Sequence, residues 1–83
     1  MTRFRAVVDV LLKRSILDPQ GRAVEATLHR LGHDNVSDVR IGKRIELKLE
    51  GERDQVERQL RDVADKVLSN PVMEDVEVTL EEV

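Results

Sequence analysis

The chain has 83 residues, of which 37% are charged, and a formal net charge of −3 at neutral pH. A chain this short has room for one hydrophobic core, so residues 1–83 are expected to form a single domain, and the acidic balance disfavours nucleic acid as a partner. The absence of cysteine excludes disulfides, thiolate metal sites and thiol nucleophiles, and a single aromatic residue leaves no platform on which bases stack.

A strand is predicted at the N-terminus, because apolar residues occupy every second position from Phe4 to Leu12. On the opposite face, Val7 and Leu11 are apolar as well. Helices in so short a chain cover only one side of a sheet, so these two residues indicate that a second subunit covers the other side. We therefore expect a homo-oligomer, either a dimer or a tetramer, with Val7 and Leu11 in its interface.

A helix is predicted from Pro19 to about Leu31. Asp18 precedes it as a capping residue, and proline suits the first helical position because no N–H is needed there. Gly32 supplies the left-handed cap at the other end. Apolar side chains three and four residues apart form a stripe that we expect to be buried: Val24, Thr27, Leu28 and Leu31.

Strand character returns from Val36 to about Glu50, with apolar residues at odd positions on both sides of Gly42. Two arrangements keep these residues on one face. They are a hairpin with a three-residue loop at 42–44 and one long strand bent at Gly42. A longer helix is then predicted over 52–68 and a final strand over 76–80.

The order of these elements is β-α-β-β-α-β, which predicts an α+β fold. Two right-handed β-α-β crossovers give a ferredoxin-like sandwich, with four strands in the sheet and both helices on one face. No apolar run approaches the roughly 20 residues that cross a bilayer, and the N-terminus lacks the pattern of a secretory signal peptide. We expect a cytoplasmic protein that does not contact the membrane.

Few residues offer chemistry of their own. His29 and His33 have the spacing at which two imidazoles share a metal, but no third ligand is spaced nearby and Gly32 ends the helix between them, so we interpret both as polar helix-end residues. The glycines are isolated, which argues against a phosphate-binding loop, and the serines lack a nucleophile-elbow sequence. No catalytic constellation and no metal site is predicted.

Two segments stand out as candidate contacts with a partner. Arg40, Lys43 and Arg44 gather around Gly42 in a chain that is acidic elsewhere, a cluster that suits an acidic partner surface or a phosphate. The alternative is a solvated strand end whose charges prevent edge-to-edge aggregation. The apolar segment 70–73 is either an ordinary helix termination or a contact with another subunit.

Three segments read together resemble the PurS family, the small subunit of phosphoribosylformylglycinamidine synthase in purine biosynthesis. They are LDPQGRAV at 17–24, DVRIGK at 38–43 and LSNPVMED at 68–75. Their order and spacing resemble the family over essentially the whole chain. The resemblance implies a noncatalytic, oligomeric subunit of a ligase, with the ferredoxin-like fold.

In that family a synthetase, PurL, uses ATP and Mg to activate the amide of formylglycinamide ribonucleotide, and a glutaminase, PurQ, releases ammonia from glutamine. The resemblance implies that this chain binds no cofactor and holds PurL and PurQ together. A small regulatory metabolite-binding module is the alternative, and a stand-alone enzyme is disfavoured. The partner contacts are expected at three groups of residues: Arg40, Gly42 and Lys43; Asp18, Pro19, Gln20 and Gly21; and Asn70 with Pro71.

Overall fold

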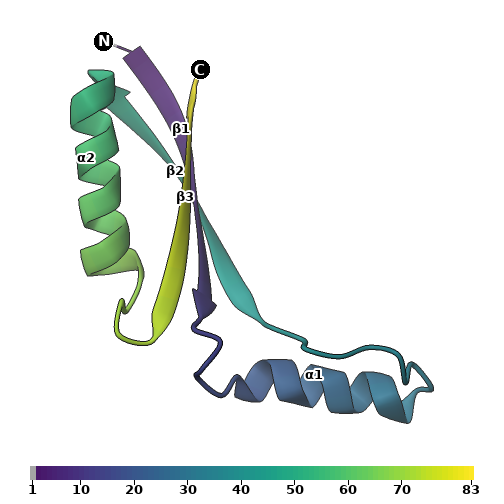
Figure 1. The fold of residues 1–83 in the computed structure, drawn as a ribbon. Helices are drawn as coiled ribbons and strands as arrows, with labels where there is room; N and C mark the ends of the chain where they lie inside the picture. Colours follow the sequence, from purple (N-terminus) through teal and green to yellow (C-terminus); the bar gives the residue numbers. More distant parts are fainter. Residues whose placement is uncertain (1) are drawn as a thin grey trace.

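The alternating apolar residues of the N-terminal segment form the central strand of an antiparallel sheet (Figure 1). The computed structural model describes residues 2–83. Its sheet has three strands in the order β2-β1-β3, which confirms the α+β class. The elements are β1 (Thr2–Leu12), α1 (Pro19–Arg30), β2 (Gly42–Gly51), α2 (Arg53–Val63), a π-helical turn η1 (Ala64–Leu68) and β3 (Glu74–Glu82).

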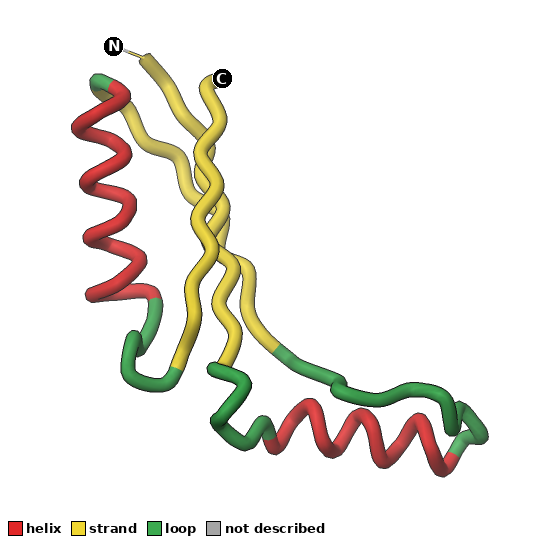
Figure 2. The backbone as a smooth tube through the Cα atoms, viewed as in Figure 1, coloured by secondary structure: helices red, strands yellow, loops and turns green. Residues whose placement is uncertain are grey.

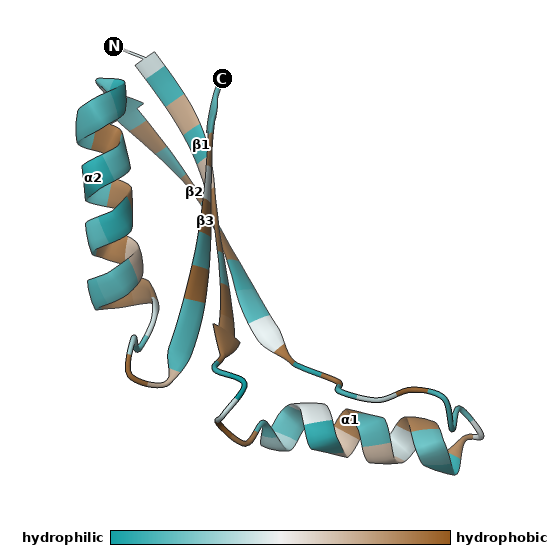
Figure 3. Cartoon of the chain, in the orientation of Figure 1, coloured by the Kyte–Doolittle hydropathy of each residue, from teal (hydrophilic) through white to brown (hydrophobic). Residues whose placement is uncertain are grey.

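The hydrophobic core lies between one face of the sheet and α2, whose hydrophobic bands are visible in Figure 3. In register, Ala6 pairs with Leu47 of β2 and Leu80 of β3, so the apolar residues of both outer strands share this face. These apolar residues of β2 and β3 are half-buried and flank the core on its two sides. The side chains that are at most 1% exposed form the centre: Phe4, Ala6, Val8 and Val10 of β1, and Val56, Leu60 and Ala64 of α2 and η1.

Segment 36–41 runs beside α1 and is not paired with the sheet (Figure 2). Within residues 2–83 the sheet therefore has three strands instead of the four expected. The chain passes directly into β2 at Gly42, which excludes the hairpin and resembles the bent-strand alternative. A Cβ atom at position 42 would lie 2.3 Å from the carbonyl oxygen of Val10, so this close approach to β1 requires glycine.

Helix α1 projects away from the sheet instead of covering it (Figures 1 and 2). The prediction that its apolar stripe is buried is therefore wrong within one chain, because Val24 is 40% and Leu31 is 66% exposed. The limits of the helix agree with the prediction, and Gly32 has a φ of 98°. The projecting helix makes the molecule elongated, with extents of 53 × 27 × 14 Å.

The face of the sheet opposite α2 carries Val7 and Leu11, as the alternation predicts. Leu11 is 43% exposed and Val7 is half-buried. Within residues 2–83 no helix covers this face (Figure 1). The role of the two residues in an oligomer stays a prediction. Polar and charged side chains line a hollow beside Val7: Arg5, Asp9, Arg44, Glu46, Thr79 and Glu81.

Leu60→Ala is expected to lower the free energy of unfolding by about 2 to 4 kcal/mol, because it removes buried methyl groups and leaves a cavity under α2. Gln59→Ala, at the exposed neighbouring position, is the matched control and should change stability by no more than about 0.5 kcal/mol. Urea denaturation followed by circular dichroism measures both. Equal effects of the two substitutions would contradict the assigned core.

Candidate partner-docking site

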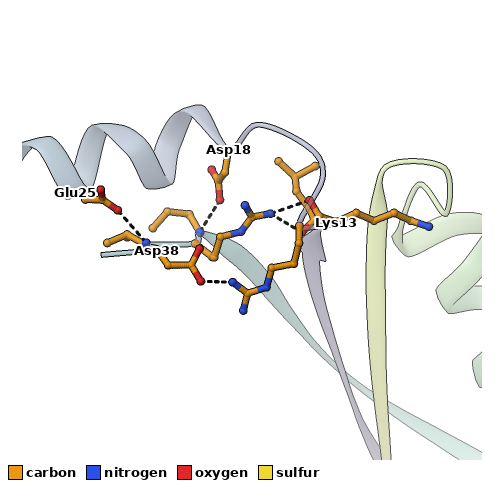
Figure 4. Close-up of polar contacts among 9 residues, drawn as sticks. Lys13, Asp18, Glu25 and Asp38 are labelled. Atoms are coloured by element: carbon orange, nitrogen blue, oxygen red, sulfur yellow. Dashed lines mark hydrogen bonds and ion pairs between the residues drawn. The ribbon is translucent and has the colours of Figure 1, made fainter. Parts of the chain in front are cut away.

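Asp18 joins the start of α1 to the segment that leads into β2. Its carboxylate accepts a hydrogen bond of 2.9 Å from the Gly21 N–H and one of 2.8 Å from the Ile41 N–H. Figure 4 shows the second of these contacts. Asp18 is only 4% exposed. One buried carboxylate therefore caps the helix and also holds the distant residue 41 against it. We call residues 12–21 and 39–43 the junction.

Arg40 holds the junction together from its other side. Its Nη2 atom donates to the main-chain oxygens of Leu12, at 2.7 Å, and Lys13, at 2.9 Å (Figure 4). The side chain is half-buried. The guanidinium therefore satisfies carbonyl groups at the end of β1. The charge pattern of the sequence indicated a contact with a partner and did not reveal these hydrogen bonds within the chain.

Side chains of α1 hold the returning segment along the helix. Glu25 accepts a 3.3 Å hydrogen bond from the Val39 N–H, and His29 Nε2 donates to the carbonyl oxygen of Val36 at 2.6 Å. Arg14 pairs with Asp38 next to the junction (Figure 4). We call residues 13–41, which these contacts join into one folded unit, the arm.

Gly21 permits the closest contact inside the arm. A Cβ atom at this position would lie 2.1 Å from the carbonyl oxygen of Val39, which is far inside van der Waals contact. Gly21 is buried, so it shapes the junction without offering a surface to a partner. A side chain at position 21 would push the first turn of α1 away from the returning segment.

The junction brings together most of the site residues predicted from the first two family-like segments. They line a shallow cavity of about 290 Å³. Arg40 instead lines a separate hollow with Arg14 and Arg22, and Arg44 lines the hollow beside Val7, so the predicted basic cluster is divided among three surfaces. Ile41 and Glu74 also line the cavity; they lie within family-like segments but were not among the predicted contact residues. The predicted residues in the cavity are Asp18, Pro19, Gln20, Gly42 and Lys43.

Asn70 and Pro71 lie in the turn between η1 and β3. The Asn70 N–H donates to Glu74 Oε1 at 2.7 Å, while Asn70 Oδ1 accepts from the Val72 N–H at 3.1 Å. The Lys13 N–H donates to the carbonyl oxygen of Met73 at 2.9 Å, which attaches the turn to the end of β1. The junction and the turn at Asn70 and Pro71 are therefore at the same end of the sheet.

The charge state of Asp18 follows from its hydrogen bonds. The Gly21 N–H is the main cause that lowers the pKa of the Asp18 carboxyl, the Ile41 N–H is the second, and the positive charge of Arg40 acts in the same direction. Burial opposes these effects without cancelling them. The carboxylate is therefore ionised at neutral pH, when both amides need an acceptor.

Residues 2–83 contain no group of three or more histidine, cysteine, aspartate or glutamate side chains that could hold a metal ion. Over the same residues, no helix has both the length and the apolar character needed to cross a membrane. The candidate site is a surface of mixed polar and apolar residues, built on hydrogen bonds between main chain and side chains. Fold and site together define a small α+β domain with a candidate interaction surface.

The chain belongs to the PurS family, whose sequence model, described as phosphoribosylformylglycinamidine (FGAM) synthase, matches residues 5–82. A curated relative, the PurS subunit of phosphoribosylformylglycinamidine synthase from Mycobacterium leprae, is 49% identical over 77 residues, which are 93% of this chain and 95% of the relative. The corresponding subunit from Bacillus subtilis is 41% identical over 80 residues, 96% of this chain and 95% of the relative.

Solved structures agree with this assignment. The crystal structure of PurS from Bacillus subtilis is similar with a TM-score of 0.87 and 40% identity, covering 95% of this chain and 99% of that one. A chain in the structure of PurLQS from Thermotoga maritima is similar with a TM-score of 0.86 and 30% identity over the full length of both chains. The projecting arm is therefore part of a fold that these proteins share.

Asp18→Asn is expected to lower the thermal unfolding midpoint at neutral pH, because an amide side chain cannot accept both hydrogen bonds as the carboxylate does. The folded-state pKa is below the unfolded value of about 3.9, so the stabilisation is complete above that value and is lost as the pH falls through the folded pKa. The difference in midpoint between wild type and variant should therefore shrink on acidification.

Thermal unfolding followed by circular dichroism from pH 7 to about pH 2.5 measures this difference. Asp34→Asn, at an exposed position beyond the end of α1, is the control and should show little difference at any pH. A difference for Asp18→Asn that stays constant or grows toward low pH would contradict the role of the ionised carboxylate.

Proposed function

We propose that this chain is the noncatalytic small subunit of a PurL/PurQ/PurS phosphoribosylformylglycinamidine synthase complex, acting in the cytoplasm as a homo-oligomer. In this reaction, ammonia released from glutamine converts formylglycinamide ribonucleotide to formylglycinamidine ribonucleotide on the pathway to IMP. The observation that carries the proposal is the PurS family match over residues 5–82. The likeness to a chain of the PurLQS structure supports the same assembly.

The chemistry divides between the partners. Hydrolysis of glutamine by a glutaminase of this type requires a nucleophilic cysteine, and this chain contains no cysteine. In the proposed complex, ATP and Mg belong to the synthetase subunit, and this chain binds no cofactor. Its contribution is to hold the two active centres in a fixed relation, so that ammonia reaches the activated intermediate before it is protonated or lost.

The junction is suited to this positioning role because its shape is already set before a partner binds. Asp18 and Arg40 hold the arm through four main-chain groups. A preformed surface loses less conformational entropy on binding than a loop that must be ordered at that moment. We infer that one partner contacts the cavity side of the junction and that the turn at Asn70 and Pro71 extends the same contact.

The predicted docking residues have different roles in this proposal. Lys43, Pro19 and Gln20 are exposed at the cavity and contact the partner directly. Of the three, only Lys43 contributes a charge. Asp18, Gly21, Arg40 and Gly42 support that surface from inside, because their contacts are with the chain itself.

The proposed function is tested by reconstitution with the cognate synthetase and glutaminase, with and without this chain. Formation of formylglycinamidine ribonucleotide from glutamine is expected to require the chain. Activity with free ammonium salts should depend on it much less, because ammonia then reaches the synthetase from solution. If neither activity depends on the chain, the regulatory module that binds a metabolite becomes the better reading, and saturable ligand binding by the isolated chain would support it.

Lys43→Glu is expected to raise the concentration of this chain needed for half-maximal glutamine-dependent activity by about tenfold, since it reverses a charge at the proposed contact. Lys48→Glu, an exposed charge reversal elsewhere on β2, is the matched control. Arg40→Glu is unsuitable for this purpose, because it also removes the hydrogen bonds to Leu12 and Lys13. Equal effects of the Lys43 and Lys48 variants would remove Lys43 from the docking surface.

A further inference from the structure

β3 forms one edge of the sheet, and its outer side is open. It pairs with β1 without a bulge, from Glu74 opposite Leu12 to Glu82 opposite Phe4. In an antiparallel strand, alternate residues direct their N–H and C=O groups away from the neighbouring strand. Within residues 2–83 no strand pairs with this outer row, and Figure 1 shows no helix or loop across it. The edge can therefore accept a further strand.

The two edges of the sheet differ in charge. Edge strands are commonly protected from unwanted pairing by lysine, by proline or by a bulge. β2 carries basic residues at positions 43, 44 and 48. β3 has no proline and no basic residue, and its acidic residues are Glu74, Asp75, Glu77, Glu81 and Glu82. A regular edge with one sign of charge repels copies of itself and attracts a strand of the opposite charge.

Two of these acids have no counter-charge from the chain itself. The odd positions of β3 lie on the face opposite α2, where Glu81 pairs with Arg5 at 3.5 Å. Within residues 2–83, Asp75 and Glu77 form no ion pair. Glu77 also lies directly opposite Asp9 of β1, and like charges in this position destabilise a sheet. A basic side chain placed beside Glu77 would relieve this repulsion.

The other face of the same edge has a hollow with an apolar floor. It lies between α2 and β3 and has a volume of about 310 Å³. Leu60, Val78 and Leu80 line it, with Glu57 and Arg61 of α2. Val78 and Leu80 are only half-buried, because no strand lies beyond β3 within the described residues. An apolar side chain from a neighbouring strand would fill the hollow and exclude water from both.

These two faces together define the kind of strand that fits. A strand beside β3 directs its side chains alternately to one face and to the other. On the α2 side they would contact Val78 and Leu80, which favours apolar residues. On the opposite side they would contact Asp75 and Glu77, which favours basic residues. The edge therefore matches a segment in which lysine or arginine alternates with an apolar residue.

A second copy of this chain does not provide such a segment. Pairing β3 with β3 would place acids beside acids. Pairing β3 with β2 of another copy would bring Glu46 and Glu50 as well as the basic residues to the acidic edge. That contact is also head-to-tail, so it leaves a free edge at each end instead of closing as a dimer. A different protein is the better occupant.

We propose that β3 is a docking edge for an extended segment of another protein, in which basic residues alternate with apolar ones, and that this segment becomes a further strand beside β3. The proposal rests on the proposed function for the identity of that protein, which is one of the two enzyme subunits. It concerns a different surface from the junction. Main-chain hydrogen bonds hold the segment, and the acids of β3 select it by charge.

A peptide tests the docking edge without either enzyme subunit. A capped peptide in which lysine and valine alternate over the length of β3 is titrated into the ¹⁵N-labelled full chain. We expect saturable binding with the largest NMR shifts in residues 74–82, and exchange of the outward N–H groups of β3 slowed by about tenfold or more. The control peptide has proline in place of each valine. It keeps the charge but cannot form the ladder, so it should bind at least about tenfold more weakly.

Charge reversal on β3 tests the selection by charge. Asp75→Lys combined with Glu77→Lys is expected to weaken binding of the lysine–valine peptide by about tenfold or more. Glu46→Lys combined with Glu50→Lys makes the same change of net charge on the other edge strand and is the matched control, with an expected change below about twofold at physiological salt. Circular dichroism checks that both variants keep their secondary structure.

Three results of these titrations would overturn the proposal. Equal binding of the two peptides, or equal weakening by the two double variants, would mean that net charge alone attracts the peptide. Absence of binding, or shifts that lie outside β3, would leave the acids as protection of the edge against aggregation.

Hydrogen exchange in the reconstituted complex tests the partner. The outward N–H groups of residues 74–82 are expected to exchange at least about tenfold more slowly in the complex with synthetase and glutaminase than in the isolated chain. A complex that forms while exchange in β3 stays unchanged would overturn the proposal and leave the proposed function intact. If no complex forms, the proposed function fails and the enzyme subunits are not the partner.

Discussion

The fold depends on the buried carboxylate of Asp18. It caps the first turn of α1 through the Gly21 N–H and binds the Ile41 N–H where the chain turns back into the sheet. Without it, the buried Gly21 amide and the partly buried Ile41 amide would lack this acceptor at the point where the arm leaves the sheet. Arg40 completes the junction by bonding the carbonyl oxygens that end β1. These few hydrogen bonds help to set the direction of the arm, because α1 projects from the sheet instead of lying over it (Figure 1).

A junction held by hydrogen bonds of this kind suits the proposed role of a subunit that acts by position. The chain offers no nucleophile of the glutaminase type and, within residues 2–83, no metal cluster. What it has is a preformed surface at one end of the sheet, where the junction and the turn at Asn70 meet through the contact between Lys13 and Met73. In the proposed function, this surface contributes geometry to a reaction whose chemistry the partner subunits perform.

Much of the local structure was predictable from short-range patterns. The two-residue period of β1 marked Phe4, Ala6 and Val8 as core, and they are at most 1% exposed. The start of α1 was marked by Asp18 and Pro19, and its end by Gly32, because capping depends on residues adjacent in sequence. Five of the residues predicted as docking residues line one cavity. The hydrogen bonds of Arg40 were not predictable, because they reach carbonyl groups 27 and 28 positions away in the sequence.

The sequence by itself determined both helices and three of the strands, which face of each is apolar, and the family to which the chain belongs. These properties depend on side chains a few residues apart and on motif spacing. Only the tertiary structure decided that segment 36–41 stays outside the sheet and that α1 projects from it. The spacing of apolar residues along a helix shows which side favours burial. It does not show whether that side is buried against the sheet of the same chain or against another molecule. The projecting direction of the arm depends on contacts such as the hydrogen bond from the Ile41 N–H to Asp18, 23 positions apart, which no local pattern records.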